Sequence, residues 1–166
     1  MKRKAGVFLL SAALMMSGGV GAIHSQAAAV VMEAAYEFQT GTVTVKMHQE
    51  MSGLINLLGK TEGYFEAESC AYQGIDKIYT YQSFEISTYP VKGKDYVGSV
   101  YFLDNTVSTK EGIKIGSTFD DMVKAYGNGY KEQNSVYRYS SGDCELSFYI
   151  NSSKKITNIE YLAVKK

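Results

Sequence analysis

The sequence of 166 residues has no tryptophan, one proline, two cysteines and two histidines. His24 lies in an N-terminal segment that we expect to be removed, so His48 is the only histidine of the predicted mature chain. A hydrolytic triad requires a base, and a structural zinc site usually requires four cysteine or histidine ligands. The shortage of histidine and cysteine therefore argues against both kinds of site. We expect no catalytic residue, no metal and no cofactor.

The N-terminal segment has the three-part pattern of an export signal. Residues 2–4 are all basic, residues 5–16 are almost entirely apolar, and small residues follow up to Ala29. We predict a signal peptide at 1–29 and a location outside the cytoplasm, either secreted or at the cell surface. The alternative is an uncleaved anchor, because residues 5–23 are just long enough to cross a bilayer. Only in that case would the protein be attached to a membrane.

Length and charge limit what the exported part can be. Removal of 29 of the 166 residues leaves 137, which is enough for one domain with a hydrophobic core. We predict a flexible N-terminal segment at 30–40 and a single domain at 41–166. The signal carries three basic residues and no acidic ones, so 14 basic and 17 acidic residues remain, a net charge of −3. Nucleic acid is therefore not expected as a partner, because its binding requires a clustered basic surface.

Both cysteines, Cys70 and Cys144, belong to the exported part of the chain. An even pair of cysteines outside the cytoplasm is compatible with one disulfide bond, which would close a long loop. The alternative is two unpaired thiols that behave as small hydrophobic side chains. The sequence leaves both alternatives open.

Hydrophobic periodicity predicts two short helices, each followed by strands. Residues 48–58 have apolar side chains at helical spacing, and residues 112–127 contain a second helix that begins at Ser117 or Thr118. Residues 60–76 lack a clear period, so we predict a packed loop there. Alternation and residue type predict six strands, at 77–82, 84–89, 96–104, 135–140, 144–150 and 155–164.

The two halves of the chain are similar in residue type. The apolar positions from Met51 to Leu58 match those from Phe119 to Tyr126 at an offset of 68 residues, and segment 84–89 matches segment 144–149 at an offset of 60. This similarity predicts two tandem repeats of a helix plus three strands. The repeats would span 41–104 and 112–164. Chance similarity among tyrosine-rich strands is the alternative.

The predicted strands are apolar on one face and polar on the other. In segment 84–89, for example, Phe84 and Ile86 alternate with Glu85 and Ser87. An antiparallel sheet with helices on one face shows this pattern, so we predict an α+β fold of that kind. The uncovered face would then carry three tyrosines and three glutamates, namely Tyr89, Tyr101, Tyr149, Glu85, Glu145 and Glu160.

The order of elements, the repeats and the export signal resemble the fold of the β-lactamase inhibitory protein and of the related small envelope proteins of the SmpA/OmlA group. The motif GxxIGSTxDDxxxxYG at 112–127 and the segment 64–89 are similar to exported proteins and lipoproteins of unknown function. The resemblance implies a sheet that grips a partner protein. It assigns no contact residue in this chain, and the acylated cysteine of the lipoproteins is missing from its N-terminal region.

Fourteen tyrosines are the feature that best predicts a function. Tyrosine supplies a large, stiff contact area with a polar tip and is enriched at binding hot spots. We therefore expect a non-catalytic module whose polar face binds a protein or a cell-envelope polymer. One alternative is that tyrosine only stabilises a half-buried sheet. Two others are a secreted inhibitor of the β-lactamase inhibitory type and a wall-glycan hydrolase that uses Glu85 and Glu145 as its carboxylate pair.

Overall fold

The structure is a computed structural model that describes residues 35–164. The predicted signal peptide at 1–29 and the first residues of the predicted segment at 30–40 lie outside the described residues. The described residues belong to one unit, which spans Met32–Lys166. They form mostly strands, with two helices of seven and eight residues.

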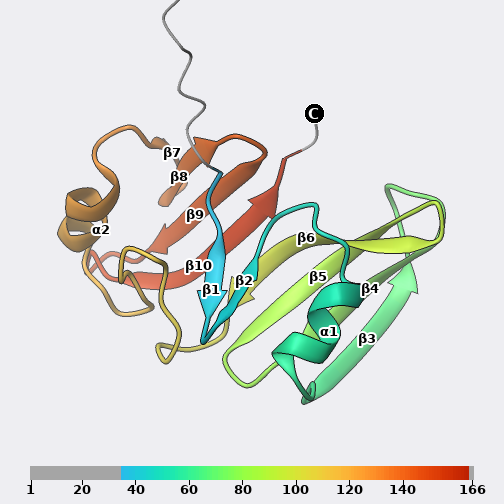
Figure 1. Ribbon diagram of the computed structural model, residues 1–166. Coiled ribbons are helices and arrows are strands. Elements are labelled where there is room, and N and C mark those ends of the chain that lie inside the picture. Colours follow the sequence, from blue (N-terminus) through green and yellow to red (C-terminus); the bar gives the residue numbers. More distant parts are fainter. Residues whose placement is uncertain (1–34, 165–166) are drawn as a thin grey trace, which may run out of the picture. The chain divides into compact units, whose positions relative to one another are not determined.

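Two β-sheets account for the strands of the described residues (Figure 1). Strands β1 and β2 form a small antiparallel hairpin. The remaining strands form one sheet of eight, with the order β3-β4-β5-β6-β10-β9-β8-β7. The bounds of the strands are β1 Phe38–Thr40, β2 Val43–Val45, β3 Gly63–Glu68, β4 Ile75–Thr80, β5 Phe84–Val91, β6 Lys94–Phe102, β7 Lys131–Gln133, β8 Val136–Ser141, β9 Cys144–Ile150 and β10 Ile156–Ala163.

All neighbours in the large sheet are antiparallel. The four strands β3 to β6 follow one another along the chain and in space, and so do β7 to β10. The two groups meet where β6 pairs with β10, and Tyr161 lies opposite Val100 there. Short connections between sequence neighbours explain the antiparallel pairing, because a parallel pair would need a long crossover.

Alternation along the strands places one face of the large sheet in the core. Strand β5 shows it most clearly, because Phe84, Ile86, Thr88 and Pro90 are buried while the residues between them are half-buried. The register extends this apolar face across the sheet from β4 to β8. One continuous row of buried side chains runs over six neighbouring strands through Tyr79, Ile86, Val100, Tyr161, Leu146 and Tyr139.

The β1–β2 hairpin covers this core where the two groups of strands meet. The ring of Phe38 in β1 is fully buried, and its centroid lies 4.9 Å from Phe84, 5.2 Å from Phe102 and 6.1 Å from Tyr161. These three partners belong to β5, β6 and β10. One aromatic side chain therefore contacts both halves of the sheet.

Each helix buries one short apolar stripe. Helix α1 (Ser52–Leu58) buries Leu54, and helix α2 (Phe119–Tyr126) buries Met122. Thr118 is the N-cap of α2, as predicted, and it forms a capping box with Asp121, in which each side chain binds the other residue's backbone N–H. Met51 precedes α1 without a side-chain cap, so α1 depends on packing for its stability.

The predicted fold class, α+β with two tandem helix plus three-strand repeats, is wrong. The described chain is mostly β, and its main element is a single sheet of eight strands. The six-strand prediction failed mainly at residues 63–68, which form β3 and not a loop. Five of the six residues of β3 are exposed, so this edge strand has no apolar alternation and is held by its pairing with β4. The match at an offset of 68 reflects the period shared by amphipathic helices, and the match at 60 reflects the alternation shared by amphipathic strands. Neither period requires repeated units.

Candidate functional site

The six predicted binding residues lie on the face of the sheet opposite the core, and we call this set the polar face. Glu85 lies opposite Tyr101, and Tyr101 lies opposite Glu160, across β5, β6 and β10. All six side chains are half-buried. The polar face consists of Glu85 and Tyr89 on β5, Tyr101 on β6, Glu145 and Tyr149 on β9, and Glu160 on β10.

The two central tyrosines of the polar face are held by hydrogen bonds to β10. The Tyr149 hydroxyl donates to Oε2 of Glu160 at 3.1 Å. The Asn158 amide donates to the Tyr101 hydroxyl oxygen. Asn158 was not predicted as a site residue, although its spacing of two from Glu160 on a strand could have placed it on the same face.

The remaining carboxylates of the polar face also have partners within the sheet. Arg138 on β8 pairs with Glu145 at 3.3 Å between Nε and Oε1. The Thr80 hydroxyl on β4 donates to Glu85 Oε1 at 2.9 Å. Each predicted glutamate therefore has a fixed neighbour on an adjacent strand, and the face is ordered without a ligand.

Glu160 is the carboxyl of the polar face whose pKa the fold shifts, and burial also raises the pKa values of Tyr89 and Tyr149. Burial raises the pKa of the Glu160 carboxyl, and the negative charge of Glu145 raises it further. The hydrogen bond from Tyr149 and the positive charge of Arg138 lower the pKa of Glu160, but they do not offset its burial. The polar face thus contains one carboxyl that resists ionisation.

The carboxylate pair weighed for hydrolysis is too far apart. Strands β6 and β10 lie between Glu85 on β5 and Glu145 on β9. Three strand spacings of about 4.8 Å separate the two residues by about 14 Å. The two carboxyls of a glycosidase lie roughly 5 to 9.5 Å apart across the scissile bond. The two carboxylates also bind partners on the outer neighbouring strands, Thr80 on β4 and Arg138 on β8, so the described arrangement does not bring Glu85 and Glu145 together.

Tyr89 lies away from the other members of the polar face, in a cluster that also contains His48. Nδ1 of His48 lies 2.6 Å from the Tyr89 hydroxyl, and Nε2 lies 3.2 Å from the Val164 carbonyl oxygen. The ring of Tyr89 stacks on Tyr72 at 4.9 Å and on Tyr96 at 6.0 Å. The contacts of Tyr89 with His48 and Tyr72 could not be predicted, because His48 lies 41 positions away and Tyr72 belongs to the segment predicted as a loop.

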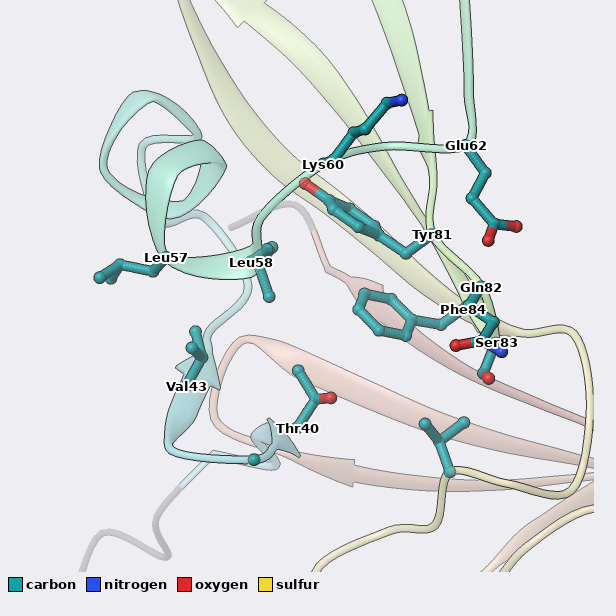
Figure 2. A pocket seen from close by; sticks show the side chains of 12 residues that line it. Thr40, Val43, Leu57, Leu58, Lys60, Glu62, Tyr81, Gln82, Ser83 and Phe84 are labelled. Carbon is teal, nitrogen blue, oxygen red and sulfur yellow. The ribbon is translucent and has the colours of Figure 1, made fainter.

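A cavity of about 390 Å³ lies where α1, the β1–β2 hairpin and the turn between β4 and β5 meet. Figure 2 shows Leu58 and Val43 on one side of it and Tyr81 and Phe84 on the other, with Thr40 between them. Its volume is within the range of about 300 to 1,000 Å³ that is typical of small-molecule sites. This cavity could not be predicted from the sequence, because its lining comes from four separate segments, at 40–43, 57–62, 81–84 and Val107.

Neither metal sites nor a disulfide was found in the described residues. Residues 35–164 contain no group of three or more histidine, cysteine or acidic side chains that could hold a metal ion. Cys70 and Cys144 are free thiols, the first exposed and the second buried, so the bond considered from the sequence is not present. Burial raises the pKa of the Cys144 thiol to about 12, which keeps it protonated and unreactive.

Neither described helix is long and apolar enough to cross a membrane.

Comparison with known proteins identifies similar structures but no family. No known family matches the chain, and no curated protein matches it. One similar crystal structure is that of an extracellular protein containing an SCP domain from Bacillus anthracis, with 12% sequence identity and a TM-score of 0.51 over 75% of this chain and 48% of that one. Another is a cysteine-rich secretory protein from Staphylococcus aureus, with 11% identity and a TM-score of 0.47 over 70% of this chain and 44% of that one. This chain thus spans about half the length of each.

The predicted resemblance to the β-lactamase inhibitory protein and the SmpA/OmlA group is wrong. The similar structure from Bacillus anthracis, with a TM-score of 0.51, is instead described as an extracellular protein that contains an SCP domain. The error has the same origin as the error in fold class, because the resemblance depended on tandem repeats of a helix plus three strands. At 12% identity the likeness to the Bacillus anthracis protein concerns the fold alone.

Proposed function

We propose that this protein acts outside the cytoplasm as a non-catalytic module whose polar face binds a protein or a cell-envelope polymer. The basic, apolar and small-residue pattern of residues 1–29 supports export. The Bacillus anthracis protein of similar fold is described as extracellular, which supports the same location. Attachment to a membrane is part of the proposal only if the signal segment stays uncleaved.

The observation that carries the proposal is the internal order of the polar face. Tyr149 is held by Glu160, and Tyr101 by Asn158. Side chains that are already fixed lose little conformational freedom when a partner binds, so more of the contact energy appears as affinity. Tyrosine rings beside hydrogen-bonded carboxylates can both stack on a partner and exchange hydrogen bonds with it.

Replacement of the tyrosines of the polar face tests the proposal. We expect the variant with Tyr89→Ala, Tyr101→Ala and Tyr149→Ala to lose capture of a partner from the surface or culture fluid of the producing cell. Tyr64→Ala is the matched control, because Tyr64 is 53% exposed on the edge strand β3 and is not part of the polar face. Mass spectrometry and glycan analysis of the captured material distinguish a protein from a polymer.

The thermal transition of each variant shows whether the fold survives the substitutions. Capture that is unchanged in the folded triple variant, or lost equally in Tyr64→Ala, would reject the polar face as the binding site. Absence of catalysis is tested separately by incubation with wall glycans and with peptides. Turnover that depends on any residue of the polar face would contradict a purely binding role.

A further inference from the structure

The Tyr81 hydroxyl is the polar group of the cavity that the fold leaves without a partner. Tyr81 is 4% exposed, and no described residue accepts or donates a hydrogen bond at its hydroxyl oxygen. Buried polar groups are almost always paired, so an unpaired hydroxyl requires an explanation. Burial also raises the pKa of Tyr81, which keeps the hydroxyl protonated and able to donate.

The surroundings of this hydroxyl favour an anionic acceptor. In Figure 2 the hydroxyl end of the Tyr81 ring points toward the backbone of Lys60, in the segment that follows α1, and the long Lys60 side chain extends away from the hydroxyl. Lys60 is exposed and forms no ion pair with any described residue. Glu62 also lines the cavity and would repel an anion, but Figure 2 shows it on the other side of Tyr81 from α1.

Part of the lining is suited to an apolar group, although Thr40, Gln82 and Ser83 add polar side chains. Val43, Leu58 and Phe84 contribute apolar side chains from β2, α1 and β5. Small-molecule sites typically combine such walls with a few polar groups that fix the orientation of the ligand. An apolar chain could therefore lie against these walls while its polar end reaches Tyr81.

We propose that this cavity binds a small amphiphile, a molecule with a short apolar chain and a carboxylate. A carboxylate oxygen accepts the hydrogen bond of the Tyr81 hydroxyl, the exposed Lys60 side chain turns its ammonium toward the carboxylate, and the apolar chain packs between Leu58 and Phe84. Two sources have this chemistry, a free short-chain acid and the C-terminal end of an apolar peptide. The site is separate from the polar face, so either proposal can fail without the other.

Titration of the exported protein, purified as the cell processes it, tests the site. The probes are hexanoate for a free acid and N-acetyl-leucine for a peptide end. Binding is monitored by NMR through the chemical shifts of the backbone amides. We expect saturable changes in the chemical shifts of Leu58, Tyr81 and Phe84. The probe with the higher affinity shows whether the natural ligand is a free acid or the C-terminal end of a peptide. Hexanol and hexylamine lack the carboxylate, so their affinity should be lower than that of hexanoate by about tenfold or more. The loss of a hydrogen bond to a charged group accounts for a difference of this size.

Tyr81→Phe separates a ligand role from a structural one. Removal of an unpaired hydroxyl should leave the thermal transition unchanged or raise it, because the buried group then needs no partner. The same change should weaken hexanoate or N-acetyl-leucine about tenfold or more. A folded Tyr81→Phe protein that binds both probes as the parent does would overturn the proposal.

Two further variants test the charge and the space of the cavity. Lys60→Gln should weaken the carboxylate probes severalfold and leave hexanol unchanged, whereas Lys92→Gln, at the other end of β5, should change neither. Thr40→Phe should block the cavity and abolish the shifts. The absence of saturable shifts at the lining residues with both carboxylate probes, or equal affinity for hexanoate and hexanol, would refute the site.

Discussion

At the scale of single residues, burial acts against the negative charge of Glu160 in the polar face. Glu160 is half-buried, accepts a hydrogen bond from Tyr149 and lies near a second glutamate, Glu145. Because burial raises its pKa, the ionised form of Glu160 is less favourable in the folded chain than in the unfolded chain. This glutamate therefore lowers the free energy of unfolding once the pH is high enough to ionise it.

Glu160→Gln should stabilise the protein at neutral pH. The amide oxygen of glutamine can still accept the Tyr149 hydrogen bond, but it carries no charge to desolvate. Since the folded-state pKa is raised, the parent is penalised as the pH rises from the ordinary glutamate range through the raised pKa, and the penalty is absent below that range. The gain should therefore be seen at about pH 8 and vanish at about pH 3.

Denaturant titrations of Glu160→Gln and of the parent at the two pH values measure this effect. Glu68→Gln, on the exposed edge strand β3, is the control for the loss of one negative charge. A stability gain that is the same at both pH values, or that appears equally in Glu68→Gln, would show that ionisation of Glu160 is not its cause.

At the scale of elements, the two helices differ in how much the local sequence specifies them. Helix α2 has a capping box, two acidic residues in its first turn and a glycine, Gly127, at its end. These local signals explain why its start could be predicted from sequence. Helix α1 has no cap and carries Gly53 near its start, so its shorter extent of Ser52–Leu58 depends on contacts that no local pattern reveals.

This difference predicts opposite effects of two alanine substitutions. Thr118→Ala removes the capping hydroxyl and should lower the free energy of unfolding by about 1 kcal/mol. Gly53→Ala should raise it by roughly 0.5 kcal/mol, because alanine favours the helix and an added Cβ meets nothing within 4 Å. Chemical denaturation of both variants measures the two changes. If both substitutions destabilised the protein equally, the conclusion that local sequence signals stabilise α2 but not α1 would be wrong.

The edge strands β3 and β7 could not be predicted from hydrophobic alternation in the sequence. Strand β3 is exposed at five of six positions, and strand β7 at all three. Neither strand buries a face, so neither has the alternation by which strands are recognised in a sequence. Their pairing with β4 and β8 is decided by backbone hydrogen bonds to strands that are themselves recognisable.

At the scale of the whole molecule, the sheet depends on one junction. The two groups of four strands are joined edge to edge by β6 and β10, and Phe38 covers this line from the core side. Truncation of a buried phenylalanine typically costs about 3 to 5 kcal/mol. Since Phe38 contacts strands of both groups, its loss should weaken both together.

Phe38→Ala should therefore lower the free energy of unfolding by about 3 to 5 kcal/mol while unfolding stays a single transition. The buried thiol of Cys144, in β9, gives an independent probe of the second group of strands. Labelling of Cys144 should accelerate in the variant, whereas the exposed Cys70 should label equally fast in both proteins. Two separate transitions, or labelling of Cys144 at the parent's rate, would show that Phe38 does not couple the two groups.

The sequence alone determined which side chains share a face. A strand alternates strictly, so the three tyrosines and three glutamates of the polar face could be assigned to one side before their neighbours were known. The sequence also limited the N-cap of α2 to Ser117 or Thr118, because capping depends on residues three positions apart, and the structure assigns it to Thr118. Both features are local, and local geometry is a direct consequence of residue order.

Only the tertiary structure decided how the strands are joined and what they enclose. The single sheet of eight strands, the His48–Tyr89 contact across 41 residues and the cavity beside Tyr81 all bring distant segments together. The sequence around each of these residues does not identify its contact partner, because pairing and packing depend on the free energy of the whole chain. For this reason the side of each strand on which a residue lies could be predicted, while Asn158 was missed, the fold class was predicted wrongly and the cavity was not predicted at all.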